Sequence, residues 1–166
     1  MVELVIVIIL IGILGTIAVG RFFERSSFDT AAWTEQVRST LRYAQKIAIA
    51  QNTPVYVHLT TARIAVCLAS DAACASADAR LTAPGGANSG SAATRAACGS
   101  GSWMCEAPPA GVKMNLPGQS GAAIGSLSFD GLGRATLIGA FAGKLEIKGD
   151  GLTQVVGVDA ETGYVD

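Results

Sequence analysis

The sequence predicts an α+β protein in which one long N-terminal helix packs on a mainly antiparallel β domain. Three observations predict this fold. An uncharged run of seventeen residues extends from Leu4 to Gly20, and a helical pattern then continues to about Gln51. Short alternating strands, separated by turn residues, fill the rest of the 166-residue chain. At ~100–200 residues per domain, this length holds one globular domain in addition to the helix.

Residues 1–20 form the first half of the predicted helix, in which Glu3 is the only charged residue. The run is close to the ~20 residues that a helix needs to cross a hydrocarbon core, and it lacks the polar face of a core helix. We therefore expect a transmembrane segment. A signal peptide would begin with basic residues, whereas an acid precedes this run. Because a charge beside such a segment marks a functional partner, we expect Glu3 to meet the amino group of a neighbouring copy.

Residues 21–52 form the second half of the helix, which becomes amphipathic. Its apolar residues, such as Trp33, Val37 and Leu41, recur at helical spacing, and charged residues follow another face. The whole helix would be on the order of 70 Å long at ~1.5 Å per residue, far longer than a bilayer needs. The second half must therefore pack on a domain. Pro54 ends the helix because it cannot continue the hydrogen-bond ladder.

Residues 53–166 are predicted to form the β-rich domain. Alternating residues from Val55 to Leu59 and from Ile64 to Leu68 predict a hairpin laid against the helix. Five further strands are expected: Val112 to Leu116, Ile124 to Phe129, Arg134 to Ile138, Lys144 to Lys148 and Gln154 to Val158. Asp and Gly residues at 130–133 and 159–163 supply turns between strands.

Residues 69–110 form a loop rich in Ala, Gly and Ser, and four cysteines lie in or beside it. An even number of cysteines in a short exported domain predicts disulfides and an oxidising compartment. We favour the local bridges, which are Cys67 to Cys74 and Cys98 to Cys105, although three connectivities are open. Zinc is the alternative. Structural zinc sites use ligand pairs two to four residues apart, and the only histidine, His58, lies outside the loop, so we predict no metal site.

The N-terminal residues MVELVIVIILIGILGTIAVGRF resemble the start of type IV pilins and pseudopilins, in which a glutamate precedes a long hydrophobic helix. The segments LRYAQKIAIAQNTPVYVHL, SFDGLGRATL and VVGVDAETGYVD look like the GspH/FimT class of minor pilins, and more narrowly like those of MSHA-type pili. In that family a basic leader is cleaved, the new N-terminus is methylated, and the glutamate is the fifth mature residue. Met1 stands where the family commonly has leucine, so either a Leu-type codon has been read as a start or the chain is truncated.

The resemblance implies a non-enzymatic structural subunit of a type IV pilus or a type II secretion pseudopilus, involved in filament assembly and in protein secretion or adhesion. Glu3 would neutralise the N-terminal amine of an adjacent subunit, because opposite charges attract strongly in low dielectric. The implied partners are other pilins through the N-terminal helix, a prepilin peptidase, and the bacterial inner membrane before assembly. The β domain would be periplasmic, behind a single membrane pass, and the chain would then enter the filament.

Enzymatic and cofactor-dependent functions find little support in the sequence. No serine or cysteine lies in a nucleophile motif, and His58 alternates with strand residues as a surface or satisfied strand histidine does. We predict no enzyme activity and no cofactor. The alternative function is that of a DNA-binding minor pilin for DNA uptake. The formal net charge of -1 disfavours it, and only Arg134 lies near the region that carries arginines in such proteins.

Overall fold

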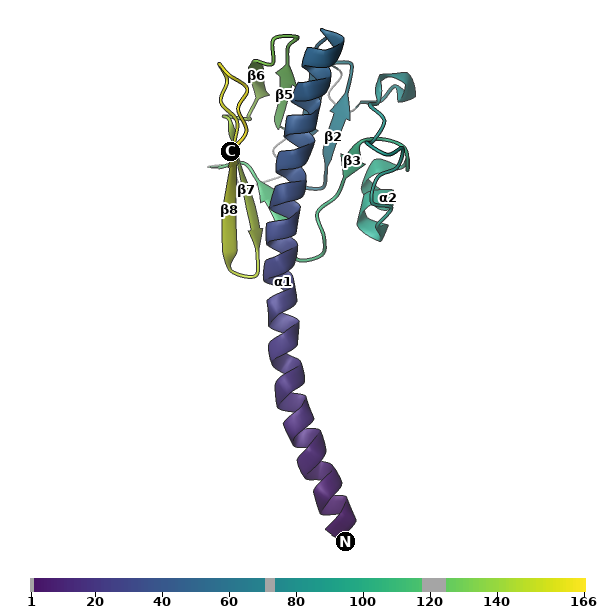
Figure 1. Ribbon diagram of the computed structural model, residues 1–166, viewed down its shortest axis with the longest axis vertical. Helices are drawn as coiled ribbons and strands as arrows, with labels where there is room; N and C mark the ends of the chain where they lie inside the picture. Colours follow the sequence, from purple (N-terminus) through teal and green to yellow (C-terminus); the bar gives the residue numbers. More distant parts are fainter. Residues whose placement is uncertain (1, 71–73, 118–124) are drawn as a thin grey trace.

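The structure is a computed structural model that describes residues 2–70, 74–117 and 125–166, with the side chains of residues 16–27 outside the description. In the described residues, helix α1 (Val2–Gln51) is followed by two antiparallel sheets. The half of α1 nearer its C-terminal end lies across the sheets, and the other half extends away from the domain toward the N-terminus (Figure 1). The helix ends three residues before Pro54, as predicted.

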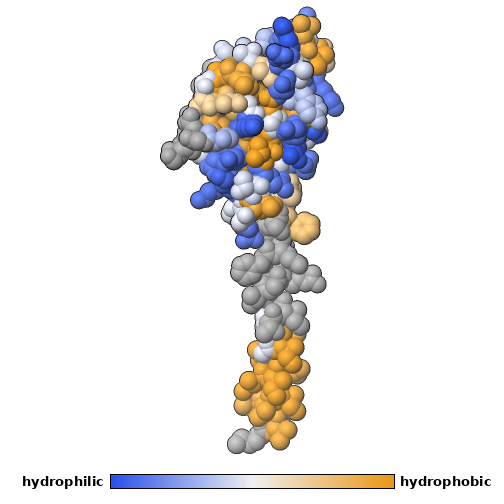
Figure 2. Space-filling model, turned by 90° about the vertical axis from the view of Figure 1, so that its left-hand side faces the viewer, coloured by the Kyte–Doolittle hydropathy of each residue, from blue (hydrophilic) through white to orange (hydrophobic). Residues whose placement is uncertain are grey.

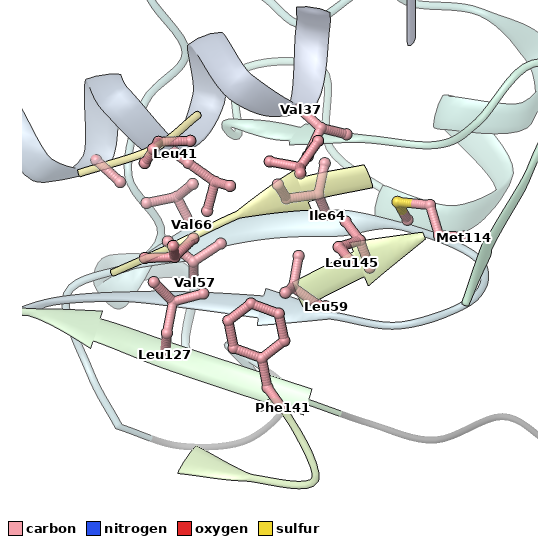
Figure 3. Packing of buried hydrophobic residues seen from close by; sticks show 14 of the residues in the cluster. Val37, Leu41, Val57, Leu59, Ile64, Val66, Met114, Leu127, Phe141 and Leu145 are labelled. Atoms are coloured by element: carbon pink, nitrogen blue, oxygen red, sulfur yellow. The ribbon is translucent and has the colours of Figure 1, made fainter. Parts of the chain in front are cut away.

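The half of α1 beside the sheets buries one face. Its buried side chains recur at spacings of three and four: Thr30, Trp33, Thr34, Val37, Thr40, Leu41, Ala44 and Ala48. This is the period of an α-helix, and it directs a single stripe at the sheets. Figure 3 shows Val37 and Leu41 pointing from the helix toward apolar side chains of the strands. The buried Thr34 hydroxyl donates to the carbonyl of Thr30 at 2.8 Å, which satisfies it within the helix.

The larger sheet has five strands in the described residues, in the order β3-β2-β1-β5-β6, with antiparallel pairing throughout. Its strands are β1 (Val55–Leu59), β2 (Ile64–Cys67), β3 (Cys105–Glu106), β5 (Gly125–Phe129) and β6 (Ala135–Gly139). Side chains alternate between the two faces of a strand. Val55, Val57 and Leu59 therefore enter the core that α1 covers, while Tyr56 and His58 lie on the opposite face.

The smaller sheet contains β4 (Lys113–Asn115), β7 (Lys144–Gly149) and β8 (Leu152–Gly157), in the order β4-β7-β8. Asp150 and Gly151 join β7 to β8 with positive φ angles of 49° and 74°, as a two-residue type I′ turn requires. The hairpin approaches α1 closely, because a Cβ atom added at Gly149 would collide with the Thr30 hydroxyl. Glycine at this position permits the contact.

The region between β2 and β4 divides between the two faces of the larger sheet: Ala83 and Met104 join the core with α1, whereas Cys74, Cys98 and Trp103 pack in a second cluster with Ala65 and Cys67. It contains a 3₁₀ helix η1 (Ala77–Ala79) and a short helix α2 (Ala92–Cys98), where the sequence predicts only loop. The Ser91 hydroxyl caps α2 by accepting from the Thr94 N–H at 3.1 Å, and Gly99 ends it in the left-handed conformation. Seven residues are too few to show a helical period in the sequence, and they depend on tertiary packing.

The predicted strands correspond to observed ones within one or two residues at each end. Ile124, which the sequence places at the start of one strand, lies outside the described residues. The α+β class and the antiparallel pairing therefore hold. These agreements follow from local alternation and from turn residues, which act over a few positions.

The structure corrects the predicted transmembrane half of the helix, and with it the single-pass inner-membrane location. Within the residues that the structure describes, no helix combines the length and the apolar character needed to cross a membrane. The apolar part of α1 with described side chains comprises fourteen residues, from Val2 to Gly15. A helix that crosses a membrane needs about 20 predominantly apolar residues. The side chains of residues 16–20, which the sequence counts in the same segment, lie outside the description.

Candidate subunit interface

The half of α1 that extends from the domain exposes apolar side chains in every direction. Eleven large apolar residues there are 47–75% exposed: Val2, Leu4, Val5, Ile6, Val7, Ile8, Ile9, Leu10, Ile11, Ile13 and Leu14. Figure 2 shows them as a continuous apolar surface at the end of α1 far from the domain. We call residues 2–15 the apolar segment. A helix that is apolar all round normally has apolar surroundings, and the described part of the domain leaves this one uncovered.

Glu3 is the one charged residue of the apolar segment, and it lies in the first turn of α1. The N-terminal end of a helix carries a partial positive charge, so an acid at this position favours the helix. The side chain is exposed. If an apolar partner covered the segment, the carboxylate would need a cation, because desolvating an unpaired charge costs several kcal/mol. The segment thus combines a non-specific apolar surface with one specific anionic group.

Two arginines on α1 fasten the C-terminal residues of the chain to the helix. Arg38 Nε donates to the main-chain oxygen of Asp166 at 2.7 Å. Arg42 donates to the Val165 carbonyl through Nε at 3.2 Å and through Nη2 at 2.9 Å. Hydrogen bonds from a charged donor are stronger than neutral ones. The domain therefore holds α1 both by its buried stripe and by these contacts, and the apolar segment continues the helix that is held.

The structure joins Cys67 to Cys74 and Cys98 to Cys105, and the described residues contain no free cysteine. This is the local pairing that the sequence favours. The two Cα atoms are 5.9 Å apart in each bridge, which lies within the usual range. All four sulfur-bearing residues are buried in one cluster behind the larger sheet. The bridges thus tie the loop of residues 69–110 to strands β2 and β3.

Trp103 organises this loop, a role that the sequence did not predict. Its indole N–H donates to the Val66 carbonyl at 2.8 Å, and its ring is buried against Ala65 and the cysteines. The guanidinium groups of Arg63 and Arg80 lie 5.2 and 4.5 Å from the ring centroid, within the range of cation–π contacts. The sequence signal that could have identified Trp103 is one large aromatic residue between two cysteines in a stretch of small residues. The loop is therefore a small second core.

The described arginine side chains are used within the fold. Each donates to a main-chain oxygen or a carboxylate: Arg38, Arg42, Arg63, Arg80, Arg95 and Arg134. Arg134, which lies nearest to the expected DNA-binding region, forms an ion pair with Asp130 at 3.0 Å. Phosphate binding depends on several available cations together. This arrangement gives no support to DNA uptake.

Asp130 and Asp159 stabilise turns, the role that the sequence predicts for them. Asp130 Oδ1 accepts from the backbone N–H groups of Leu132 and Arg134, both at 2.9 Å. The N–H of Arg134 is the main reason that the pKa of Asp130 lies below its ordinary value. Asp159 accepts from the hydroxyl of Thr162 at 2.7 Å, and this bond is the main cause of its lowered pKa. Both carboxylates are thus held ionised as hydrogen-bond acceptors in turns.

His58 is a buried histidine that the fold brings to a pair of cysteines. It is 4% exposed, and a ring nitrogen and the sulfurs of Cys67 and Cys74 lie within 4.8 Å of one another. The sequence argument against zinc placed His58 outside the loop. His58 does lie outside residues 69–110, but strand pairing brings it beside the loop, because it pairs with Ala65, two residues before Cys67. The hairpin of residues 55–67 was predicted, so its register could have revealed this neighbour.

No family model, curated protein or solved structure matches the chain. The choice of a function therefore depends on how the residues of this chain are arranged. The principal features are an uncovered apolar segment with one acid, a domain that holds the adjoining half of the helix, and a loop closed by two disulfides.

Proposed function

We propose that the protein is a non-enzymatic structural subunit of a filament, a minor pilin or pseudopilin of a type IV pilus or a type II secretion pseudopilus. The observation that carries the proposal is the uncovered apolar segment with Glu3 in its first turn. Related helices packed side by side in a filament would cover such a segment on all sides. The resemblance of the N-terminal residues to those of pilins also supports related helices as the groups that cover the segment.

Burial of the apolar segment would drive assembly. Fully burying one Val, Leu or Ile side chain is worth about 1.5–3 kcal/mol. The eleven apolar side chains are about half exposed to begin with, so covering them would contribute on the order of 10 kcal/mol. This is comparable with the ~4–15 kcal/mol that association costs in lost motion. Apolar burial would therefore make assembly feasible, and it would need a further contact to select the correct register.

Glu3 would supply that register. Helices covered with Val, Leu and Ile can slide past one another at little cost, whereas a single buried charge must meet its partner. A free amino group at the start of an adjacent helix is a suitable cation, because either charge alone is penalised in an apolar surrounding. The β domain would then lie on the outside of the helix bundle, where it acts in secretion or adhesion.

The test replaces Glu3 by Gln, which keeps the size of the side chain and removes its charge. We expect at least a tenfold loss of co-purification with the other pilins of the same filament, with no change in the thermal unfolding of the domain. The matched control is Glu35→Gln on the same helix. Glu35 has an exposed side chain that pairs with Arg38 inside the chain, so this variant should assemble normally. Normal incorporation of Glu3→Gln would refute the proposed role.

A further inference from the structure

We propose that His58, Cys67 and Cys74 form a redox-gated Zn²⁺ site, which opens when the Cys67 to Cys74 disulfide is reduced. One ligand atom from each residue already lies within 4.8 Å of the other two, and all three residues are buried. In a tetrahedral zinc site the ligand atoms are about 3.5–3.8 Å apart. The two sulfurs would therefore separate modestly after reduction, while the imidazole would approach them.

The larger sheet fixes two of the three ligands. His58 on β1 and Cys67 at the end of β2 both lie on the face turned away from α1. They are diagonal neighbours across the strand pair, since His58 is opposite Ala65 and Cys67 is opposite Tyr56. Diagonal neighbours lie within reach of long side chains. This placement depends on strand pairing, so it persists when the disulfide is absent.

Contacts other than the disulfide hold the third ligand. Arg80 Nε donates to the Cys74 carbonyl at 3.1 Å, and the guanidinium of Arg80 stacks on Trp103. Cys74 also has a φ of 47°, a left-handed conformation that residues with a Cβ atom seldom adopt. The Arg80 contact thus holds a residue whose backbone conformation is unusual. Cys74 would remain near His58 and Cys67 in the reduced chain.

The donor set favours Zn²⁺ over the common hard cations. Two thiolates and an imidazole suit Zn²⁺, whereas Mg²⁺ and Ca²⁺ prefer oxygen ligands. Two thiolates also neutralise the charge of Zn²⁺, which suits a buried position. Three protein ligands would leave a fourth position for water. The Cys98 to Cys105 bridge has the same sequence separation and the same Cα distance, yet the chain has no second histidine to complete a site there.

The redox step is an exchange with a dithiol. The dithiol transfers two electrons to the disulfide bond and becomes a cyclic disulfide, while its two protons pass to the sulfurs of Cys67 and Cys74. Binding of Zn²⁺ then releases these two protons to solvent as the thiolates form. The metal would replace the covalent bond between β2 and the loop. The loop would thereby keep its position in the reduced protein.

The experiment titrates Zn²⁺ against a chromogenic chelator with the purified full chain, reduced by a dithiol that is then removed under anaerobic conditions. We expect one Zn²⁺ per reduced chain and none per oxidised chain. The variant His58→Asn should bind at least tenfold more weakly, since loss of an outer-shell partner alone costs ~10-fold or more. The double variant Cys67→Ser, Cys74→Ser should lose the site. The matched control Cys98→Ser, Cys105→Ser should keep it.

Three results would overturn the proposal: a reduced wild-type chain without zinc, equal affinity in His58→Asn, or zinc that is lost with Cys98 and Cys105. Zn²⁺ should also raise the melting temperature of the reduced wild type and leave that of reduced His58→Asn unchanged. If His58→Asn does not fold, Co²⁺ bound to the reduced Cys98→Ser, Cys105→Ser variant decides. A thiolate-to-cobalt absorption band is expected there, and its absence refutes the site.

Discussion

The two halves of helix α1 share a backbone conformation and differ in what covers them. Between Thr30 and Ala48 a stripe of side chains is buried under the sheets, whereas the apolar segment exposes large apolar residues on all sides. The half from Thr30 to Ala48 has polar residues at helical spacing, whereas the apolar segment has almost none. Helix formation needs only local hydrogen bonds, but placement needs a face that distinguishes inside from outside. The described part of the domain therefore does not cover or place the unpatterned half.

The largest expected difference between the two halves is in how much a Leu→Ala substitution lowers the stability of the fold. We expect Leu41→Ala to lower the free energy of unfolding by about 2–5 kcal/mol, because removal of a buried leucine loses apolar contact and leaves a cavity. Leu41 is 1% exposed, whereas Leu10 in the apolar segment is 54% exposed. Leu10→Ala should change the free energy of unfolding of the unassembled protein by less than about 0.5 kcal/mol. Urea denaturation measures both, and equal losses would contradict the comparison.

A smaller effect tests how the covered half of α1 holds the end of the chain. We expect Arg42→Met to lower the free energy of unfolding by about 1 kcal/mol, because two charge-assisted hydrogen bonds to Val165 are lost from a partly solvated position. Hydrogen exchange of the backbone amides of residues 163–166 should become faster. Lys46→Met, an exposed position one turn further along α1, is the control. Unchanged exchange in Arg42→Met would show that the buried stripe alone suffices.

The smallest expected effect is a dependence of stability on pH at the Asp159 turn, which lies beside the covered half of α1. The hydroxyl of Thr162 lowers the pKa of Asp159 in the folded protein. This group therefore stabilises the fold above its unfolded pKa of about 3.9, and the contribution disappears as the pH falls through the lower folded pKa. Asp159→Asn should be less stable than the wild type near neutral pH, and the two should converge in acid. A constant difference between pH 2 and 6 would contradict this expectation.

The candidate sites differ in how far the sequence predicts them. Glu3 is visible because it stands alone beside an uncharged run, and the sequence favours the local cysteine pairs without excluding the other connectivities. The nearness of His58 to Cys67 and Cys74 was missed, because it depends on the register of a hairpin and on the return of a loop. Trp103 was missed for the same reason, since its partner Val66 is 37 residues away.

The sequence by itself determined the features that depend on neighbours a few residues apart. Pro54 ends α1, alternation marks the strands, and the order of polar residues divides the helix into two halves. Asp150-Gly151 also carried a local turn signal, which was not used to predict the hairpin between β7 and β8. Such features follow from backbone sterics and side-chain period, which act without the rest of the chain.

Only the tertiary structure decided which distant groups meet. It placed Asp166 on Arg38, 128 residues earlier, and it left Val2 to Gly15 without cover in the described domain. It also brought the buried face of the disulfide loop to the side of the sheet opposite α1. Long-range contacts such as these are selected by the packing of the whole chain, because each must repay the loop-closure entropy that separates its partners. A local sequence pattern carries no information about that entropy cost.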